Sequence, residues 1–362
     1  MQKHSEVQLG AAIGRISLMV LIGAGQMQGA AAQSAPPTPA SLESIIVSGT
    51  RAGSLLNETG STVSVITAAE LEERQIRFVS DALRQVPGMA VSRQGPAGTL
   101  TQVRIRGAEA NHTVVVVDGV KINDPFTSEV DFAHLLSAQI DRIEILRGPQ
   151  SVLYGSEAIG GVISIFTKRG DPGVQFEASA EAGSFSTYDG TAAVRGAGAA
   201  WNYALSASGF STDGTNVSRF GSEDDGSRNR IFYARAGWAP SPGASVEGSV
   251  RYRNNRSMSD PQDFGFPPTP TFGLVVDGDQ RIEGDQFDAI VRGRLTTGPI
   301  DHQLAFTRTK TEENTFVDGV FAGGFAGSRN RVDYQGTWRL GGASLPQSVT
   351  IAAEYERQQF ES

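Results

Sequence analysis

Cysteine is absent from the 362-residue chain, and histidine occurs only four times. Without cysteine no disulfide framework exists, and the absence fits a periplasm that would oxidise stray thiols. A surplus of basic residues is also lacking, because the net charge of -8 disfavours a nucleic-acid binder. No stretch beyond the N-terminal region reaches the roughly 20 apolar residues of a spanning helix. A membrane role would therefore require strands, since only helices and closed barrels satisfy every backbone group in lipid.

Catalytic signatures are missing as well. The sequence contains no His-Glu-x-x-His, no Gly-x-Ser-x-Gly and no phosphate-binding glycine loop with its lysine. His112 lies beside an apolar run and is expected to be a loop residue rather than a ligand. The sequence thus predicts that the protein is not an enzyme.

The N-terminal region has the features of a targeting segment. Lys3 and Arg15 precede an apolar run over 16–25, and the small residues at 30–32 supply a cleavage site. Residues 1–32 are therefore predicted to be a cleavable signal peptide of an exported protein. A spanning anchor is the alternative, but the run is too short for one.

A linker and a short β-prone run follow, together covering 33–49. Residues 33–42 are rich in Ala, Pro, Ser and Thr, a composition that predicts a flexible linker. The run Glu43-Ser44-Ile45-Ile46-Val47-Ser48 suits a strand that adds to the sheet edge of a partner. It suits equally well the first strand of the next domain.

Residues 50–170 read as a compact α/β unit. Thr67 and Glu70 have capping-box spacing and open a helix, and Ser80 is expected to cap a second helix that ends at Pro87. Strands are predicted around 103–105, 114–117 and 143–145, and a further apolar helical face is formed by Phe132, Leu135 and Leu136. A small mixed sheet carrying helices is the simplest assembly.

The same unit carries several motifs in a fixed order: SDALRQVPGM, VRIRG, VVVVDGVKIND and LRGPQSVLYGSEAIGGVISIFTKRG. Together they resemble the plug domain of TonB-dependent receptors, in particular the group of the outer-membrane cobalamin receptor. The resemblance covers residues 43–170. The motif residues that carry it are Arg104, Arg106, Gly107, Asp118, Gly119, Arg147, Gly148, Pro149, Tyr154, Gly155, Gly160 and Gly161.

The resemblance implies a plug inside a barrel of about 22 strands. It also implies that Glu43, Ser44, Ile45, Ile46, Val47 and Ser48 form the box that the periplasmic TonB protein grips, which favours the partner-binding interpretation of this run. In that setting Arg104, Arg106, Arg142 and Arg147 are expected to face polar and acidic residues of the barrel lumen. Individually weak, wet contacts of this kind would let a pulled plug shift.

The remainder, 171–362, shows the period-two alternation of lipid-facing strands. Val174, Phe176, Ala178 and Ala180 alternate with polar residues, and similar faces recur as far as Tyr355. A soluble sandwich alternates too. Connection lengths favour the membrane strands, because short turns (239–244, 297–300, 341–347) alternate with long loops (212–227, 254–280, 312–328), as in outer-membrane barrels.

The first long loop carries an acidic group. Asp213, Glu223, Asp224 and Asp225 supply oxygen ligands of the type that Ca²⁺ prefers. The cobalamin receptor has calcium-binding aspartates in the corresponding loop, although the spacing here departs from that pattern. A solvated acidic loop is the alternative to a structural calcium site, and no other cofactor is expected.

Taken together, the sequence predicts an α+β plug followed by an incomplete antiparallel transmembrane β-barrel, with about nine strands of an expected 22. The expected function is TonB-dependent uptake of a scarce, bulky nutrient across the cell outer membrane, with cobalamin first and an iron-siderophore complex second. A passive porin or adhesin is the alternative class. Because an open sheet edge is costly in lipid, the chain alone is expected not to be transport-competent and to belong to a longer parent.

Overall fold

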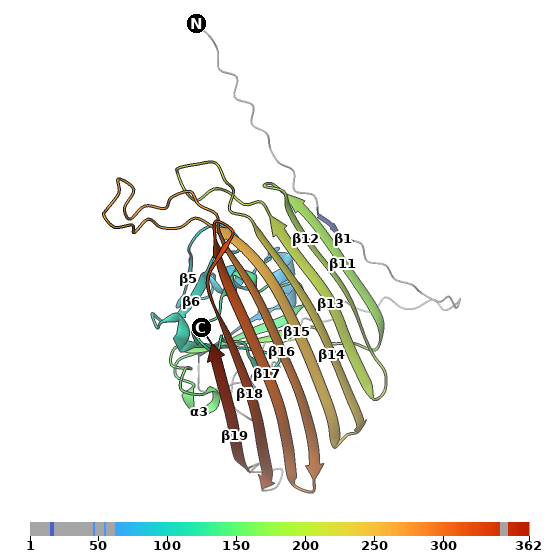
Figure 1. Ribbon diagram of the computed structural model, residues 1–362. Coiled ribbons are helices and arrows are strands. Elements are labelled where there is room, and N and C mark those ends of the chain that lie inside the picture. Colours follow the sequence, from blue (N-terminus) through green and yellow to red (C-terminus); the bar gives the residue numbers. More distant parts are fainter. Residues whose placement is uncertain (1–14, 18–45, 48–53, 56–61, 341–346, 362) are drawn as a thin grey trace, which may run out of the picture.

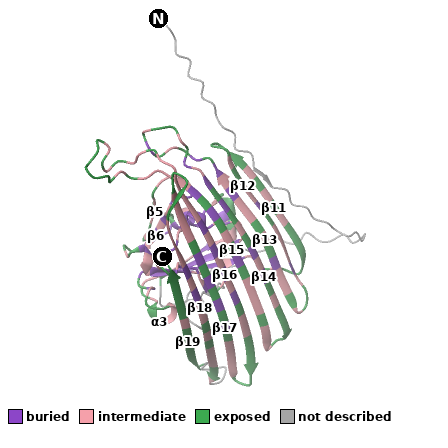
Figure 2. Ribbon diagram, in the orientation of Figure 1, coloured by how far each residue is buried: buried purple, intermediate pink, exposed green. Residues whose placement is uncertain are grey.

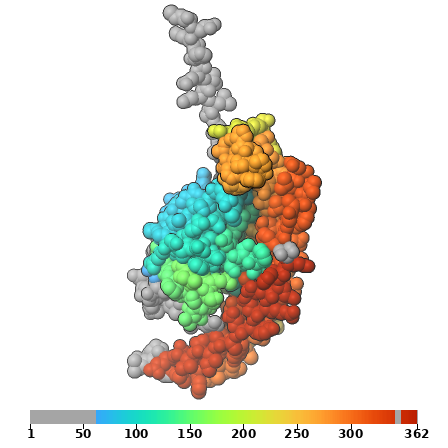
Figure 3. Space-filling view, turned by 60° about the vertical axis from the view of Figure 1, so that its left-hand side comes forward, coloured from blue at the N-terminus to red at the C-terminus, as the bar shows by residue number. Residues whose placement is uncertain are grey.

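The computed structural model describes residues 15–17, 46–47, 54–55, 62–340 and 347–361, the first three segments as backbone only. Two units follow one another: a small α/β domain over 62–167 and a large antiparallel sheet over 173–361. The sheet is curved, and the α/β domain lies against its concave side (Figure 1; Figure 3). No helix in the described part of the chain is long and apolar enough to cross a membrane.

The α/β domain, called the plug from here on, is built on one mixed sheet. Its strand order is β4 (Thr62–Thr67), β9 (Ile140–Arg147), β10 (Gly161–Thr167), β7 (Thr113–Val117) and β8 (Val120–Lys121). Only β10 and β7 pair in parallel. A separate hairpin joins β5 (Met89–Arg93) to β6 (Thr101–Ile105). The predicted mixed sheet is confirmed.

Three short α-helices and two 3₁₀ turns complete the plug: α1 (Ala68–Glu73), α2 (Val79–Leu83), α3 (Ser151–Tyr154), η3 (Ala110–His112) and η4 (Phe132–His134). Branched and aromatic side chains from the sheet and helices, among them Val79, Leu83, Phe132, Ile143 and Ile163, form its fully buried core. This core gives the plug a rigid body of its own, since buried side chains at native packing density leave little room for rearrangement.

The start of α1 is confirmed, whereas that of α2 differs from the prediction. Thr67 and Glu70 form both halves of a capping box. Ser80, predicted to cap α2, lies inside it and is fully buried. The helix begins after Phe78 instead, because the first helical amide, that of Val79, donates to the carbonyl of Leu135 at 2.9 Å. A tertiary contact thus takes the place of a side-chain cap.

The predicted helical face of Phe132, Leu135 and Leu136 is also wrong in part. Only a single 3₁₀ turn forms, and Asp131 caps it by accepting the Ala133 amide at 2.9 Å. Leu136 lies outside the turn and forms a β-bridge with Phe78. The chain extends there because the Leu135 carbonyl accepts the Val79 amide and the Ser137 amide donates to the Arg77 carbonyl.

Nine strands form the curved sheet, called the wall from here on: β11 (Gly173–Gly183), β12 (Thr187–Ala197), β13 (Trp201–Thr212), β14 (Ser227–Ser241), β15 (Ala244–Ser259), β16 (Gln280–Thr297), β17 (Ile300–Val317), β18 (Val320–Leu340) and β19 (Gln347–Glu361). Each pairs antiparallel with the next, and β1 (Arg15–Ser17) pairs with β11 at the edge. The predicted plug and antiparallel strands, about nine in number, are confirmed.

The two faces of the wall differ in chemistry as the alternation predicts. Outward positions carry exposed Val174, Phe176, Phe232, Leu304 and Val332, whereas the alternate positions are polar and often buried against the plug (Figure 2). All three tryptophans of the chain, Trp201, Trp238 and Trp338, point outward near the end of the wall that has the short turns.

Connection lengths agree with the prediction except at one place, and most of the turn predicted at 341–347 lies outside the described residues. The turns at 242–243 and 298–299 are short, and long loops occupy 213–226 and 260–279 at the opposite end (Figure 1). The loop predicted at 312–328 does not exist, because β17 and β18 run on to a two-residue turn at Asp318 and Gly319. Both residues have positive φ, 52° and 74°, as a hairpin turn of the Asp-Gly type requires.

Candidate functional site

The plug meets the wall through the segment 118–124, which follows β7. Asp118, with φ 49°, accepts hydrogen bonds from the Tyr233 hydroxyl at 2.7 Å and from Arg235 at 3.2 Å, both on β14. Its carboxylate also accepts the amide and the hydroxyl of Thr167 in β10, at 3.1 and 2.7 Å. One buried carboxylate therefore ties two plug strands to the wall.

Arginines on the wall surround this carboxylate. Glu247 on β15 accepts from Arg235 at 2.8 Å and from Arg292 at 2.7 Å, and Arg294 lies 3.4 Å away. Gly119 lies beside them with φ +95°, a conformation that favours glycine, and a Cβ built on it would lie 2.1 Å from the Arg292 guanidinium, which would then have to move. The Asp-Gly pair of the plug motif thus permits close approach to a cationic wall.

A second set of contacts holds the end of the same segment. The Asn123 carbonyl accepts from Arg329 at 2.9 Å, and the Ile122 carbonyl accepts from Gln286 at 3.1 Å. The Thr311 hydroxyl donates to the Asp124 carboxylate at 2.5 Å. Most acceptors here are plug carbonyls, so the wall recognises the path of this backbone more than its side chains.

Other plug contacts reach the first wall strands. Arg77, between α1 and α2, pairs with Glu181 of β11 at 2.5 Å and stacks over Phe210 of β13, and Phe78 meets the same ring edge to face. Lys168 after β10 pairs with Glu177 at 3.3 Å. These residues were not singled out by the sequence, because nothing local distinguishes them from solvated surface charges.

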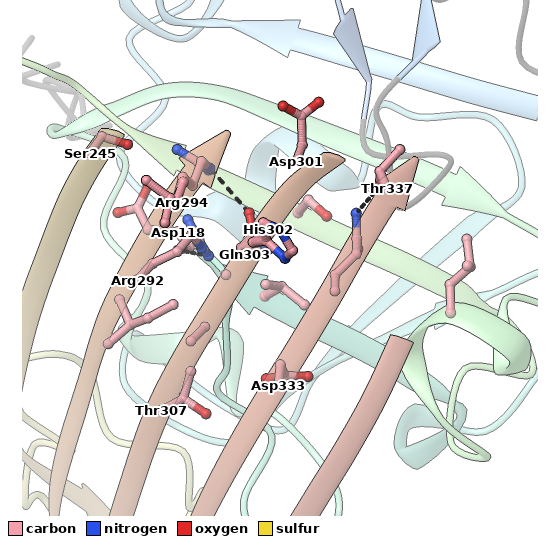
Figure 4. Close-up of a pocket in the computed structure, with 18 of the residues that line it drawn as sticks. Asp118, Ser245, Arg292, Arg294, Asp301, His302, Gln303, Thr307, Asp333 and Thr337 are labelled. Atoms are coloured by element: carbon pink, nitrogen blue, oxygen red, sulfur yellow. Dashed lines mark hydrogen bonds between the residues drawn. The ribbon is translucent and has the colours of Figure 1, made fainter. Parts of the chain in front are cut away.

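A cavity of about 1200 Å³ separates plug and wall towards the short-turn end. Asp118 of the plug and Arg169, which follows the plug, line one side, and residues of β15 to β19 line the other. Figure 4 shows Arg292 near Asp118, and Arg294 donating to Gln303 at 3.1 Å. The lining is mixed: charged side chains such as Asp118, Arg169 and Arg292 alternate with apolar ones such as Leu153 and Ile290.

The predicted TonB-binding residues are described only in part. Ile46 and Val47 form β2 and pair antiparallel with β3 (Ser54–Leu55). Glu43, Ser44, Ile45 and Ser48 lie outside the described residues. The assignment of this box stays a prediction.

The plug motif 147–161 forms one local structure around α3. The Gly148 amide donates to the Gly160 carbonyl, and that of Gln150 to Ala158, both within 2.9 Å. A Cβ on Gly161 would lie 2.3 Å from the carbonyl oxygen of Leu146, so glycine is required where β10 begins. Tyr154 ends α3, and Gly155 follows with φ 90°.

The predicted role of the motif arginines is not what the structure shows. Arg104 donates to Ser92 and Gln102, Arg106 to Thr62, Arg142 to Asp141 and Glu144, and Arg147 to Ser64 and the Pro87 carbonyl. These partners all belong to the plug. The wall contacts come instead from the carboxylates and carbonyls of 118–124 and from Arg77 and Lys168, which sequence position alone does not reveal.

Buried ionisable groups of the plug have shifted pKa values. Burial lowers the pKa of His134 well below its usual value, so the ring is neutral and its 3.5 Å approach to Asp131 is not an ion pair. Burial raises the pKa of Asp131, although the Thr101 and Ala133 amides oppose the shift. Burial and the nearby Arg329 lower the pKa of Lys121. These groups are structural, since each is enclosed between plug and wall.

The acidic residues of the first long loop join those of the second. Burial, followed by the charges of Asp279, Asp225, Asp260 and Asp277, raises the pKa of Glu223. Burial likewise raises the pKa of Asp225, which accepts the Val217 amide at 2.9 Å. The proximity of these carboxylates was not predicted from the sequence, because Asp260, Asp277 and Asp279 lie on another loop.

The calcium prediction gains no ligand set from this arrangement. Within the described ranges, no group of three or more His, Asp or Glu side chains is placed to hold a metal ion. Of the four predicted ligands, only Glu223 and Asp225 are drawn into mutual electrostatic contact. A calcium site at Asp213, Glu223, Asp224 and Asp225 therefore stays a prediction.

Comparison with known proteins shows which proteins these features resemble. Residues 56–162 match the family model of the TonB-dependent Receptor Plug Domain. This range contains the hairpin, the helices and most of the mixed sheet described above. The chain therefore carries a TonB-dependent receptor plug domain, followed by a nine-strand antiparallel sheet.

Solved structures resemble the whole arrangement. The siderophore receptor PirA from Acinetobacter baumannii matches with TM-score 0.64 at 20% identity, over 82% of this chain and 48% of that chain. FpvA of P. aeruginosa, bound to a pyoverdine and iron, matches with TM-score 0.69 at 14% identity, over 86% and 44%. The ferric enterobactin receptor PfeA from Pseudomonas aeruginosa matches with TM-score 0.63 at 18% identity, over 84% and 50%. The chain spans about half the length of these receptors.

Proposed function

We propose that this chain is part of a TonB-dependent receptor that imports an iron-siderophore complex through the outer membrane. The observation that carries the proposal is a plug of the TonB-dependent type seated on the polar, concave face of a sheet whose other face is apolar. The plug is joined to the wall by separate polar contacts, at 118–124 and at Arg77 and Lys168, which can break without unfolding its core. Gated import requires a plug that can be released from its wall contacts, whereas a passive porin does not.

Membrane placement is supported by the outward face of the wall. Exposed Val, Leu, Ile and Phe side chains cover it, and a soluble protein seldom exposes apolar patches of that extent. Outward tryptophans at the short-turn end suit a membrane interface. The long loops then face the outside, the short turns face the periplasm, and an N-terminal signal peptide would serve export.

Two partners follow from this function. TonB would pull on the segment 43–48, whose two described residues already adopt strand conformation and offer an edge for pairing. The ligand would be an iron chelate, since siderophore receptors are the solved structures that resemble this fold. Cobalamin, the first expectation from the sequence, has no such support and becomes the alternative.

Growth of a deletion strain separates these ligands. Cells lacking the gene are grown on limiting iron supplied as different siderophore chelates and, separately, on limiting cobalamin. A growth defect on one iron chelate, restored by the intact gene, supports the proposal. A defect on cobalamin alone would identify cobalamin as the ligand instead. If no limitation causes a defect, the proposed import function is rejected.

A further inference from the structure

The outward face of the wall carries a belt of cations just above its apolar band. The members, called the basic belt, are Arg228, Arg230, Arg256, Arg308, Lys310 and Arg357, and all six are exposed. Their alternate neighbours, such as Asn229, Asn255 and Thr309, are buried against the plug. The belt therefore faces away from the lumen, on the side where lipid would lie.

Few carboxylates neutralise the belt. Among the described residues, Arg228, Arg230, Arg308 and Arg357 have no carboxylate within ion-pairing distance. Lys310 approaches Glu312 at 3.7 Å, Arg256 approaches Glu283 at 3.9 Å, and Asp285 also lies on the outward face at this level, so carboxylates balance the six cations only in part. The belt thus carries excess positive charge in a chain whose net charge is -8.

Two of these arginines oppose each other directly. Arg228 and Arg256 are Cα partners across β14 and β15, and Arg230 is the next outward residue on β14. Like charges in directly opposed positions destabilise a sheet. Such an arrangement is favourable once an anion lies between them, and arginine forks bind phosphate oxygens in pairs.

The belt occurs at one end of the wall only. Outward positions at the short-turn end carry Trp201, Trp238 and Trp338 and, within the described strands, no Lys or Arg. Along β14, Trp238 and Arg230 are eight residues apart, which is about 26 Å along a strand or about 20 Å across a tilted sheet. That height approaches the apolar band of roughly 25 Å in outer-membrane barrels, so the belt lies at headgroup level on the long-loop side.

We propose that the basic belt binds the phosphate groups of lipids in the leaflet on the long-loop side. The inference rests on the proposed membrane placement but not on the imported ligand or on TonB. The triad Arg228, Arg230 and Arg256 forms the centre of the site, because these residues adjoin on two paired strands. Phosphate-bearing lipid would fix the height of the wall and stabilise β14 and β15 below the two long loops.

Native mass spectrometry of the purified protein in detergent tests the site. Wild type is titrated with bisphosphorylated lipid A, with the same lipid after dephosphorylation, and with inorganic phosphate. The triple variant R228Q/R230Q/R256Q removes the charges, R228K/R230K/R256K keeps them, and Arg84→Gln removes an exposed arginine of the plug as a control. Heat-modifiable migration on gels checks that each variant is folded.

The expected result is retention of phosphorylated lipid by wild type and by the lysine variant, with binding by the glutamine variant at least about ten-fold weaker. Arg84→Gln should bind as wild type does, and dephosphorylated lipid should be held weakly by all. Equal retention by wild type and the glutamine variant would overturn the proposal. So would competition by millimolar inorganic phosphate, which would indicate a site for soluble anions. If the glutamine variant does not fold, wild type alone still tests the proposal, because it should bind the dephosphorylated lipid more weakly than the phosphorylated lipid. Equal binding of the two lipids would overturn the proposal.

Discussion

Replacing Asp118 by alanine removes the carboxylate that joins β7, β10 and the wall. Its side chain and that of Arg235 are each 5% exposed, so the change leaves a buried guanidinium with Glu247 as its remaining partner. Removing one member of a buried pair costs about 3–5 kcal/mol. We therefore expect Asp118→Ala to loosen the plug from the wall rather than to unfold the plug, whose core lies elsewhere.

Hydrogen exchange measures this loosening at named amides. The Thr167 amide donates to Asp118, and its exchange should accelerate by roughly a hundred-fold or more in the variant. The matched control is Asp141→Ala, which removes an exposed plug carboxylate paired with Arg142 and should cost only about 0–1 kcal/mol. Cells carrying Asp118→Ala should also admit bulky antibiotics that wild type excludes.

A double-mutant cycle with Arg235→Ala isolates the pair. If Asp118 acts through Arg235, the double variant should be less destabilised than the sum of the single variants, by at least about 1 kcal/mol. Two outcomes would refute the reasoning: Asp118→Ala with exchange no faster than Asp141→Ala, or strictly additive single effects.

Three further predictions concern other parts of the chain. Ile46→Pro should abolish energised uptake while ligand capture persists, because proline removes a backbone hydrogen-bond donor from the strand. Ile46→Val should leave both uptake and capture intact. Transport by the proline variant would reject the assignment of the TonB-binding segment. Ala234→Arg should impair membrane assembly by about 2–4 kcal/mol, and Ala234→Leu should not, because this outward residue lies midway along the apolar band; equal assembly of both would contradict lipid contact. The folded-state pKa of Glu223 is raised, so its contribution to stability is present at low pH and lost as pH rises through the folded value. Loop proteolysis should therefore be faster at neutral than at mildly acidic pH, and Asp277→Asn should flatten that difference; a pH-independent rate would argue against carboxylate repulsion.

Local patterns in the sequence account for much of the fold. The outward and inward faces of the wall follow from period-two alternation, because neighbouring side chains of a strand point to opposite sides. The capping box at Thr67 and Glu70 needs only residues three positions apart. The Asp318-Gly319 turn is also readable, since Asp-Gly between β-prone runs favours a tight hairpin. The loop predicted there shows that polar composition is the weaker signal.

The candidate site was predictable only on the plug side. Asp118 and Gly119 stand out in the sequence as a turn that ends a buried strand. Their partners Tyr233 and Arg235 lie more than a hundred residues further along and look like ordinary members of an alternating strand. Which of many inward arginines meets the plug depends on the register and curvature of the wall.

Most elements and the two faces of the wall therefore follow from the amino-acid sequence: a plug with its glycine turns, and strands with one apolar and one polar face. Which charges meet is set by the tertiary packing instead. The Leu135 carbonyl, rather than Ser80, binds the first amide of α2. Glu223 lies near carboxylates of another loop, and Asp118 pairs with Arg235. The physical reason is range: backbone propensity and alternation act over a few residues, whereas an ion pair or a close approach depends on the packing of segments far apart in the chain.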